Sequence, residues 1–101
     1  PLPLRETAIR AISKRSMAID LYVWLAYRLH VLGRPIEIGW PTLKEQFGEG
    51  YKELRFFRRD VLPSIELALA AYPEAHVQVD EKRGLTLPPS SPPVPKALRE
   101  R

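Results

Sequence analysis

One stretch of the chain, residues 50–72, carries two unlike faces and limits how the remaining residues can fold. At about 100° per residue, its apolar side chains gather on one side of a helix. These side chains are Leu54, Phe57, Val61, Ile65 and Leu69. Lys52, Arg55 and Arg59 fall on the opposite side, with Phe56 beside them. The stretch therefore predicts a helix with a core face and a separate cationic face.

The cationic face works against an isolated helix. Arg55 and Arg59 are like charges at i,i+4, and Lys52 stands at i,i+3 from Arg55. Each such pair destabilises a helix by roughly 0.2–0.5 kcal/mol. A polyanion that binds there would remove this cost. A basic surface in contact with solvent alone is the alternative, since Lys and Arg are ordinary helix-forming residues.

Composition limits the classes of protein to consider. The 101 residues suffice for one domain, and a net charge of +4 favours an anionic partner. The absence of cysteine excludes disulfides, thiolate metal sites and cysteine catalysis. No membrane-spanning run and no signal-peptide pattern occur, so we expect a cytoplasmic protein. Because the chain starts at Pro1 without methionine, we expect an excised domain or a processed fragment.

Two helices are expected before the central stretch. Residues 5–12 read as a short helix, residues 13–16 as a break, and residues 17–32 as a long helix. Ser16 is a suitable N-cap for the long helix, and Gly33 a suitable stop. The long helix is apolar nearly all round, which predicts burial on more than one face. We therefore expect the short helix to fold back and cover part of the long one.

The long helix has two apolar sides and a few polar exceptions. One side carries Leu21, Leu25, Leu29 and Leu32, and the far side carries Ile19, Val23 and Ala26. Asp20 and Arg28 are the polar residues expected near the core, and Arg28 is spaced to lie on the ring of Trp24. Arg28 reads either as a phosphate ligand or as a member of an internal ion pair. The ion pair is favoured, because a buried arginine needs a partner.

The remaining elements complete a recognisable order. Residues 36–39 read as a short strand, residues 42–47 as a helix opened by Pro41, and residues 48–50 as a glycine turn. Pro63 predicts a kink or break in the basic helix near Leu62. A short helix, a turn and a longer basic helix follow the order of a helix-turn-helix.

A hairpin is expected after the basic helix. Residues 76–80 and 84–87 alternate as strands, which points Val77, Val79, Leu85 and Leu87 inward. Residues 80–83 form the tip and carry Lys82 and Arg83. The whole pattern predicts an α+β, mainly α, winged helix over residues 1–87. Residues 88–101 are rich in proline and charge, which predicts a tail.

No catalytic, metal-binding or nucleotide-binding pattern is found in the sequence. His30 and His76 have no acidic partner at ligand spacing, and the phosphate-binding motifs GxxxxGK[ST] and GxGxxG do not occur. No serine has a paired base. Glu45, Glu49 and Glu53 read as a solvated face. We therefore expect no enzyme activity, no cofactor and no metal.

Long strings of the sequence resemble a known family. They are AIDLYVWLAYRLHVLGRPIEIGWPTLKEQFG, YKELRFFRRDVLPSIELALAAYPEA and the ending GLTLPPSSPPVP, and they cover roughly residues 4–95. They resemble the C-terminal domain of plasmid-encoded replication initiators of the RepA type. The resemblance implies a bacterial winged-helix domain that binds duplex DNA at a plasmid origin. It also leaves in doubt any activity that needs the larger N-terminal portion of such initiators.

The cationic face of residues 50–72 and the hairpin tip contain most of the candidate DNA-binding residues. They are Lys44, Lys52, Arg55, Arg59, Lys82 and Arg83. Arg58 ranks below them because it lies near the apolar edge of the helix. A protein-interaction or dimerisation module and a transcriptional regulator remain the alternatives, the former because Phe56 lies beside the basic stripe. A homodimer and host replication proteins are further candidate partners.

Overall fold

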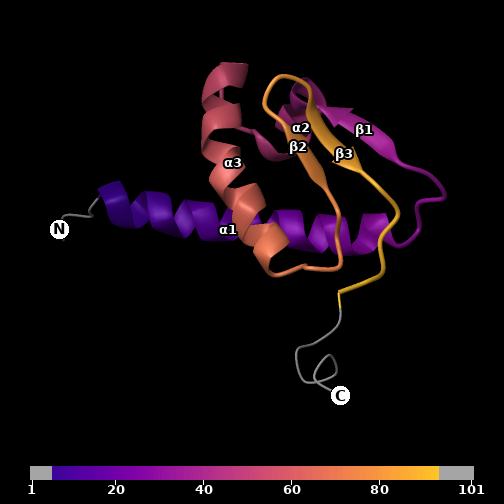
Figure 1. The fold of residues 1–101 in the computed structure, drawn as a ribbon. Coiled ribbons are helices and arrows are strands. Elements are labelled where there is room, and N and C mark those ends of the chain that lie inside the picture. Colours follow the sequence, from indigo (N-terminus) through magenta and orange to yellow (C-terminus); the bar gives the residue numbers. More distant parts are fainter. Residues whose placement is uncertain (1–5, 94–101) are drawn as a thin grey trace.

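The structure is a computed structural model that describes residues 6–93, with side chains from residue 14 onward. Its elements are α1 (Glu6–Leu29), β1 (Ile36–Gly39), α2 (Trp40–Phe47), α3 (Leu54–Ala70), β2 (Gln78–Asp80) and β3 (Gly84–Leu87). Figure 1 shows α1 running across the base of the molecule, α3 crossing it, and the sheet beside α3. These residues form a small α+β domain that is compatible with the winged-helix prediction.

The three strands form one antiparallel sheet with β3 in the centre. Ile36 of β1 pairs with Leu87 of β3, and Asp80 of β2 pairs with Gly84. Leu85 and Leu87 are buried, as the alternation predicted. The inward orientation predicted for Val79 is wrong, since this residue is 41% exposed. All three residues of β2 are exposed, and β2 is a short strand at the edge of the sheet.

The hydrophobic core lies between α1, α3 and the sheet. The leucines at 21, 25 and 29 of α1 pack in one cluster with Phe57, Val61 and Ile65 of α3. Leu54 and Leu69 are partly buried against the same cluster. The predicted core face of the central stretch is therefore confirmed. Other members are Ile38, Trp40, Leu43, Ala68, Tyr72, Leu85 and Leu87.

The predicted break at residues 13–16 is wrong, because α1 is one continuous helix of 24 residues. Ser16 lies inside it and caps nothing, and the helix ends at Leu29, before Gly33. No glycine or proline occurs between Glu6 and Leu29. Serine lowers helix propensity by less than about 0.7 kcal/mol relative to alanine, which is too little to interrupt a long apolar helix. The first turns therefore cannot fold back onto the rest of α1.

Two polar residues of α1 also differ from expectation. Asp20 and Arg28 were expected near the core, and both are exposed. The guanidinium of Arg28 lies 5.5 Å from the centre of the Trp24 ring, as the spacing predicted. Because Arg28 is exposed, it needs no internal ion pair.

Pro63 lies inside α3 without ending it, so of the predicted kink or break near Leu62 the break does not occur. A proline in a helix interior removes one backbone hydrogen bond and costs about 3 kcal/mol. Val61 and Ile65 on either side of it are each only 1% exposed. Their burial against α1 holds the two halves of α3 in one helix.

The chain beyond β3 stays against the body as far as it is described. The backbone N–H of Ser90 donates to the carbonyl of Leu29 at 3.2 Å, and the Tyr72 hydroxyl donates to the carbonyl of Ser91. Residues 94–101, the last part of the predicted tail, lie outside the described residues. Over residues 6–93, no helix combines the length and the apolar character that crossing a membrane requires.

Candidate nucleic-acid interface

The cationic candidates gather at one end of the molecule. Figure 1 shows the first turn of α3 and the turn between β2 and β3 at the same end, above α1. The N-terminal half of α3 carries Arg55 and Arg59, whose side chains are 69% and 65% exposed. Lys82 and Arg83 are exposed in the β2–β3 turn. We call this turn, residues 80–83, the wing tip.

Arg55 and Arg59 both make cation–π contacts with Phe56. Their guanidinium carbons lie 4.7 Å and 5.1 Å from the centre of its ring. Each arginine also has a carboxylate neighbour, since Arg55 lies 3.3 Å from Glu53 and Arg59 lies 2.8 Å from Asp60. Exposed ion pairs of this kind contribute about 0–1 kcal/mol. A phosphate or a base edge can therefore displace either carboxylate at small cost.

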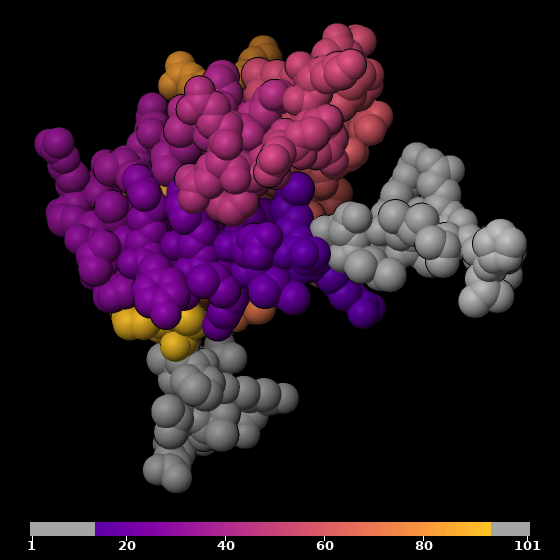
Figure 2. All heavy atoms as spheres, turned by 180° about the vertical axis from the view of Figure 1, so that it is seen from behind, coloured from indigo at the N-terminus to yellow at the C-terminus, as the bar shows by residue number. Residues whose placement is uncertain are grey.

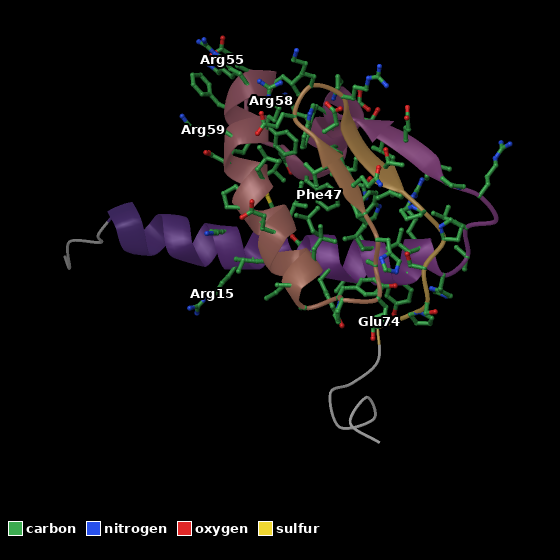
Figure 3. All side chains as sticks on the ribbon, viewed as in Figure 1. Arg15, Phe47, Arg55, Arg58, Arg59 and Glu74 are labelled. Atoms are coloured by element: carbon green, nitrogen blue, oxygen red, sulfur yellow. The ribbon has the colours of Figure 1, made fainter. Side chains whose placement is uncertain are left out.

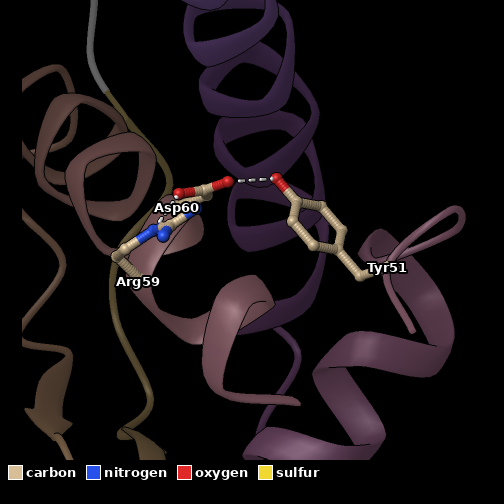
Figure 4. A network of polar contacts seen from close by, with 3 residues as sticks. All are labelled: Tyr51, Arg59 and Asp60. Carbon is tan, nitrogen blue, oxygen red and sulfur yellow. Dashed lines mark hydrogen bonds and ion pairs between the residues drawn. The ribbon is translucent and has the colours of Figure 1, made fainter. Parts of the chain in front are cut away.

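A polar network fixes the turn that leads into α3. The Tyr51 hydroxyl donates to Oδ2 of Asp60 at 2.8 Å, while Nε of Arg59 donates to Oδ1 of the same carboxylate at 2.8 Å (Figure 4). The Tyr51 ring packs edge-on against Phe57 at 5.7 Å. Burial of the Tyr51 ring, followed by its hydrogen bond to Asp60, raises the pKa of the hydroxyl. The network orients Arg59, and the sequence analysis missed it because Tyr51 and Asp60 follow no helical spacing.

Lys52 lies outside α3, although the sequence analysis placed it on the cationic face of this helix. It lies in the bend before α3, which begins at Leu54, and its side chain is exposed. The helical periodicity therefore predicted the exposed side of α3 for Arg55 and Arg59 correctly. It does not apply to Lys52, because α3 starts later than residue 50. Lys44, in the last turn of α2, is only half-exposed.

Asp80 organises the wing tip. Its Oδ1 accepts hydrogen bonds from the backbone N–H of Lys82 at 2.8 Å and of Arg83 at 3.0 Å. These two bonds, Arg83 first, lower the pKa of the Asp80 carboxyl. An aspartate that bonds backbone N–H groups two and three residues later is a common way to close a tight turn. The turn therefore holds the backbone that carries both wing cations.

Trp40 ties the wing tip to the rest of the domain. Its indole Nε1 donates to the carbonyls of Asp80 at 3.1 Å and Glu81 at 2.9 Å. Its backbone N–H donates to the carbonyl of Arg83 at 3.3 Å. The indole is only 1% exposed, so these bonds fasten the tip to the first residue of α2.

Arg58 joins α3 to the same tip. Its Nη1 donates to the carbonyl of Glu81 at 3.1 Å. In Figure 3, Arg55 and Arg59 extend from the side of α3 away from the hairpin, while Arg58 extends toward it. Arg58 therefore fixes the spacing between the helix and the wing. Its half-buried side chain agrees with its predicted position near the apolar edge.

The end of the hairpin requires glycine at position 84. Gly84 has a φ of +133°, and a Cβ built there would lie 2.1 Å from the carbonyl oxygen of Ile38. This φ is one that residues with a side chain rarely adopt. The sequence analysis placed Gly84 at the start of the strand without identifying this contact with β1.

The site residues thus form two cationic groups on one frame. The first is Arg55 and Arg59 with Lys52 before them, and the second is Lys82 and Arg83. Exposed carboxylates at Glu45, Glu49 and Glu53 lie among them in sequence, so the surface is mixed in charge. Within residues 6–93, no group of three or more His, Asp or Glu side chains is placed to hold a metal ion.

Comparison of the chain with protein-family models, with curated proteins and with solved structures found no match. The resemblance to RepA-type initiators therefore stays a prediction.

Proposed function

We propose that this domain is a winged helix that binds duplex DNA. The observation that supports this most directly is the hydrogen bond from Arg58 to the Glu81 carbonyl. It holds α3 and the wing tip in one frame, with exposed cations on each. A duplex presents a groove and a flanking phosphate backbone, so a protein that binds it needs a helix and a second contact at fixed spacing.

The N-terminal half of α3 is the part we assign to the major groove. Arg55 and Arg59 are exposed, and both guanidinium groups lie over the ring of Phe56. A guanidinium in this position can donate two hydrogen bonds to the O6 and N7 atoms of guanine. We assign Lys52, Lys44, Lys82 and Arg83 to phosphates, where an ammonium or guanidinium acts as a charge without reading sequence.

The biological target we propose is the origin DNA of a plasmid, with the domain acting as part of a replication initiator. This rests on the resemblance of the sequence strings to RepA-type initiators. A transcriptional regulator would bind DNA by the same physics, and only the identity of the bound sequence separates the two.

The test measures affinity for duplexes that contain origin repeats and for scrambled duplexes, at two salt concentrations. We expect binding to the repeats to be tighter and to weaken steeply with salt. Arg55→Ala and Arg59→Ala should each cost about 1–3 kcal/mol with the repeats alone. The double variant Lys82→Ala/Arg83→Ala should weaken both kinds of duplex equally and flatten the salt dependence.

Arg15→Ala is the matched control, because it removes the same charge from an exposed site on α1. Arg58→Ala instead breaks the hydrogen bond between α3 and the wing tip. It should change affinity less than Arg55→Ala, since its guanidinium is occupied by the Glu81 carbonyl. Circular dichroism establishes that each variant is folded. A dominant effect of Arg58, with Arg55 and Arg59 neutral, would show that α3 enters DNA on another face.

A protein-interaction module is the second candidate, supported by the 39% exposure of Phe56 among the arginines. An exposed aromatic ring flanked by arginines is a common centre of a protein interface. Binding that persists at high salt, and that is lost with Phe56→Ala but not with Arg59→Ala, would favour this candidate over DNA.

A further inference from the structure

An apolar stripe on α1 has no partner within the described part of the chain. Ile19, Val23 and Tyr27 follow at four-residue spacing and are 62%, 45% and 75% exposed. Val31, in the turn after the helix, is 69% exposed. We call these four residues the α1 stripe. Leu21, Leu25 and Leu29, on the opposite side of the same helix, are each 1% exposed or less.

The stripe is large for a surface feature of a small domain. Its four apolar side chains are between 45% and 75% exposed, so the stripe is comparable with the largest apolar patch on a typical monomer, about 300–600 Å². Figure 2 shows α1 lying uncovered across the rear of the molecule. Because α1 runs straight, its first turns cannot shield the stripe, and residues 88–93 contact the body elsewhere, at Leu29 and Tyr72.

We propose that the α1 stripe binds the α1 stripe of a second copy of this chain, with the two helices antiparallel and a two-fold axis beside Val23. The spacing of the stripe suits this arrangement. Ile19 and Tyr27 are equally far from Val23 along the chain, so each Ile19 lies opposite the Tyr27 of the other copy. A medium side chain then meets a large one at both contacts, and the two small valines meet at the axis, where the helices approach most closely.

Charge selects the antiparallel arrangement over the parallel one. Arg15 and Asp20 are exposed beside the stripe. In a parallel pair, Arg15 would lie next to the Arg15 of the second copy, and Asp20 next to its Asp20. Like charges in contact are unfavourable. In the antiparallel pair the two Arg15 side chains are roughly 24 Å apart along the axis, at 1.5 Å per residue. Each Arg15 then lies near the C-terminal end of the other copy's α1, where a cation is favourable.

The stripe covers part of the area that a dimer needs. A stable protein interface buries roughly 800 Å² on each partner. The remainder of the contact must come from residues beside the stripe on the same helix, among them Arg15, Asp20 and Trp24. The pairing also leaves α3 and the wing tip uncovered in both copies, because α3 packs against the opposite side of α1 and the wing tip lies at the end of the molecule away from α1. The inference does not depend on DNA binding.

The first experiment measures the oligomeric state of the full chain by sedimentation equilibrium. Val23→Lys places two ammonium groups at the proposed axis and should raise the dissociation constant at least tenfold. Leu67→Lys, at a site on α3 that is 43% exposed, adds the same charge away from the stripe and should leave it unchanged. Because Val23 is exposed, the variant should fold, and circular dichroism checks this.

The second experiment fixes the orientation. The chain has no cysteine, so single cysteines can be introduced without background. With a short bismaleimide, Val23→Cys should cross-link to itself, and Ile19→Cys should cross-link to Tyr27→Cys in a mixture of the two variants. Self-cross-linking of Ile19→Cys alone would replace the antiparallel arrangement with a parallel one. A chain that stays monomeric at about 100 µM, or a dimer that Val23→Lys does not weaken, overturns the proposal.

Discussion

The base of the domain and its cationic end are held together by different forces. In the base, α1 and the second half of α3 bury leucine, valine and isoleucine side chains almost completely. At the cationic end, Trp40 and Arg58 donate hydrogen bonds to backbone carbonyls of the wing tip, and Asp80 accepts from its N–H groups. The base should therefore respond to the volume of its side chains. The cationic end should respond to the loss of single donors and to backbone conformation.

The largest effect is expected in the base. Leu25→Ala removes a side chain that is 1% exposed in the middle of the core, and should lower the free energy of unfolding by about 2–5 kcal/mol. Leu67→Ala is the matched control, since it makes the same change at a site that is 43% exposed and should cost under about 1 kcal/mol. Chemical denaturation measures both. Equal losses of stability in the two variants would contradict the conclusion that buried apolar side chains stabilise the base.

A backbone change at the wing comes next. Gly84→Ala should cost about 2–4 kcal/mol, because the new methyl group meets the Ile38 carbonyl at 2.1 Å and φ is +133°. Gly84 is in the last pair of both ladders, so the strands can part slightly and limit the cost. Gly50→Ala separates the two causes. Its φ is +93° but nothing lies within 4 Å, so it should cost only about 1–2 kcal/mol in a thermal melt.

The donor that ties the wing tip to α2 gives a smaller effect on stability. Trp40→Phe keeps an aromatic ring in the core but removes both indole hydrogen bonds, and should cost about 1–3 kcal/mol. Hydrogen exchange should also become faster at residues 78–84 than in α1. Uniformly faster exchange through the whole domain would show that Trp40 acts by packing alone.

The smallest effect concerns acid. Two backbone N–H groups hold the pKa of Asp80 below its ordinary value of 3.8. The carboxylate therefore stabilises the wing tip fully above pH 3.8, and this contribution is lost as the pH falls through the lower pKa of the folded state. An NMR titration of the Asp80 carboxyl should give a midpoint below 3.8. In Asp80→Asn, the amide shifts of Lys82 and Arg83 should lose this step, and its persistence would assign the step to another group.

Features governed by local spacing could be predicted from the sequence. The strands at residues 36–39 and 84–87, the proline at the start of α2, and the core face of α3 all follow from periodicity and turn residues over a few positions. Both wing cations were placed on a hairpin tip for the same reason. The sequence analysis missed the hydrogen bonds of Trp40 and Arg58 to that tip, since their partners lie 41 and 23 residues away in the chain.

The sequence by itself determined which side chains are apolar, where β3 begins, and that one group of cations lies on the basic helix and a second on the hairpin tip. The tertiary structure alone decided that α1 runs unbroken through Ser13 and Ser16, and that α3 continues past Pro63. It also decided that of two apolar sides of α1 only one is buried. The physical reason is that propensities at single residues amount to a few tenths of a kcal/mol up to about 3 kcal/mol, whereas burial against another element stabilises many residues together.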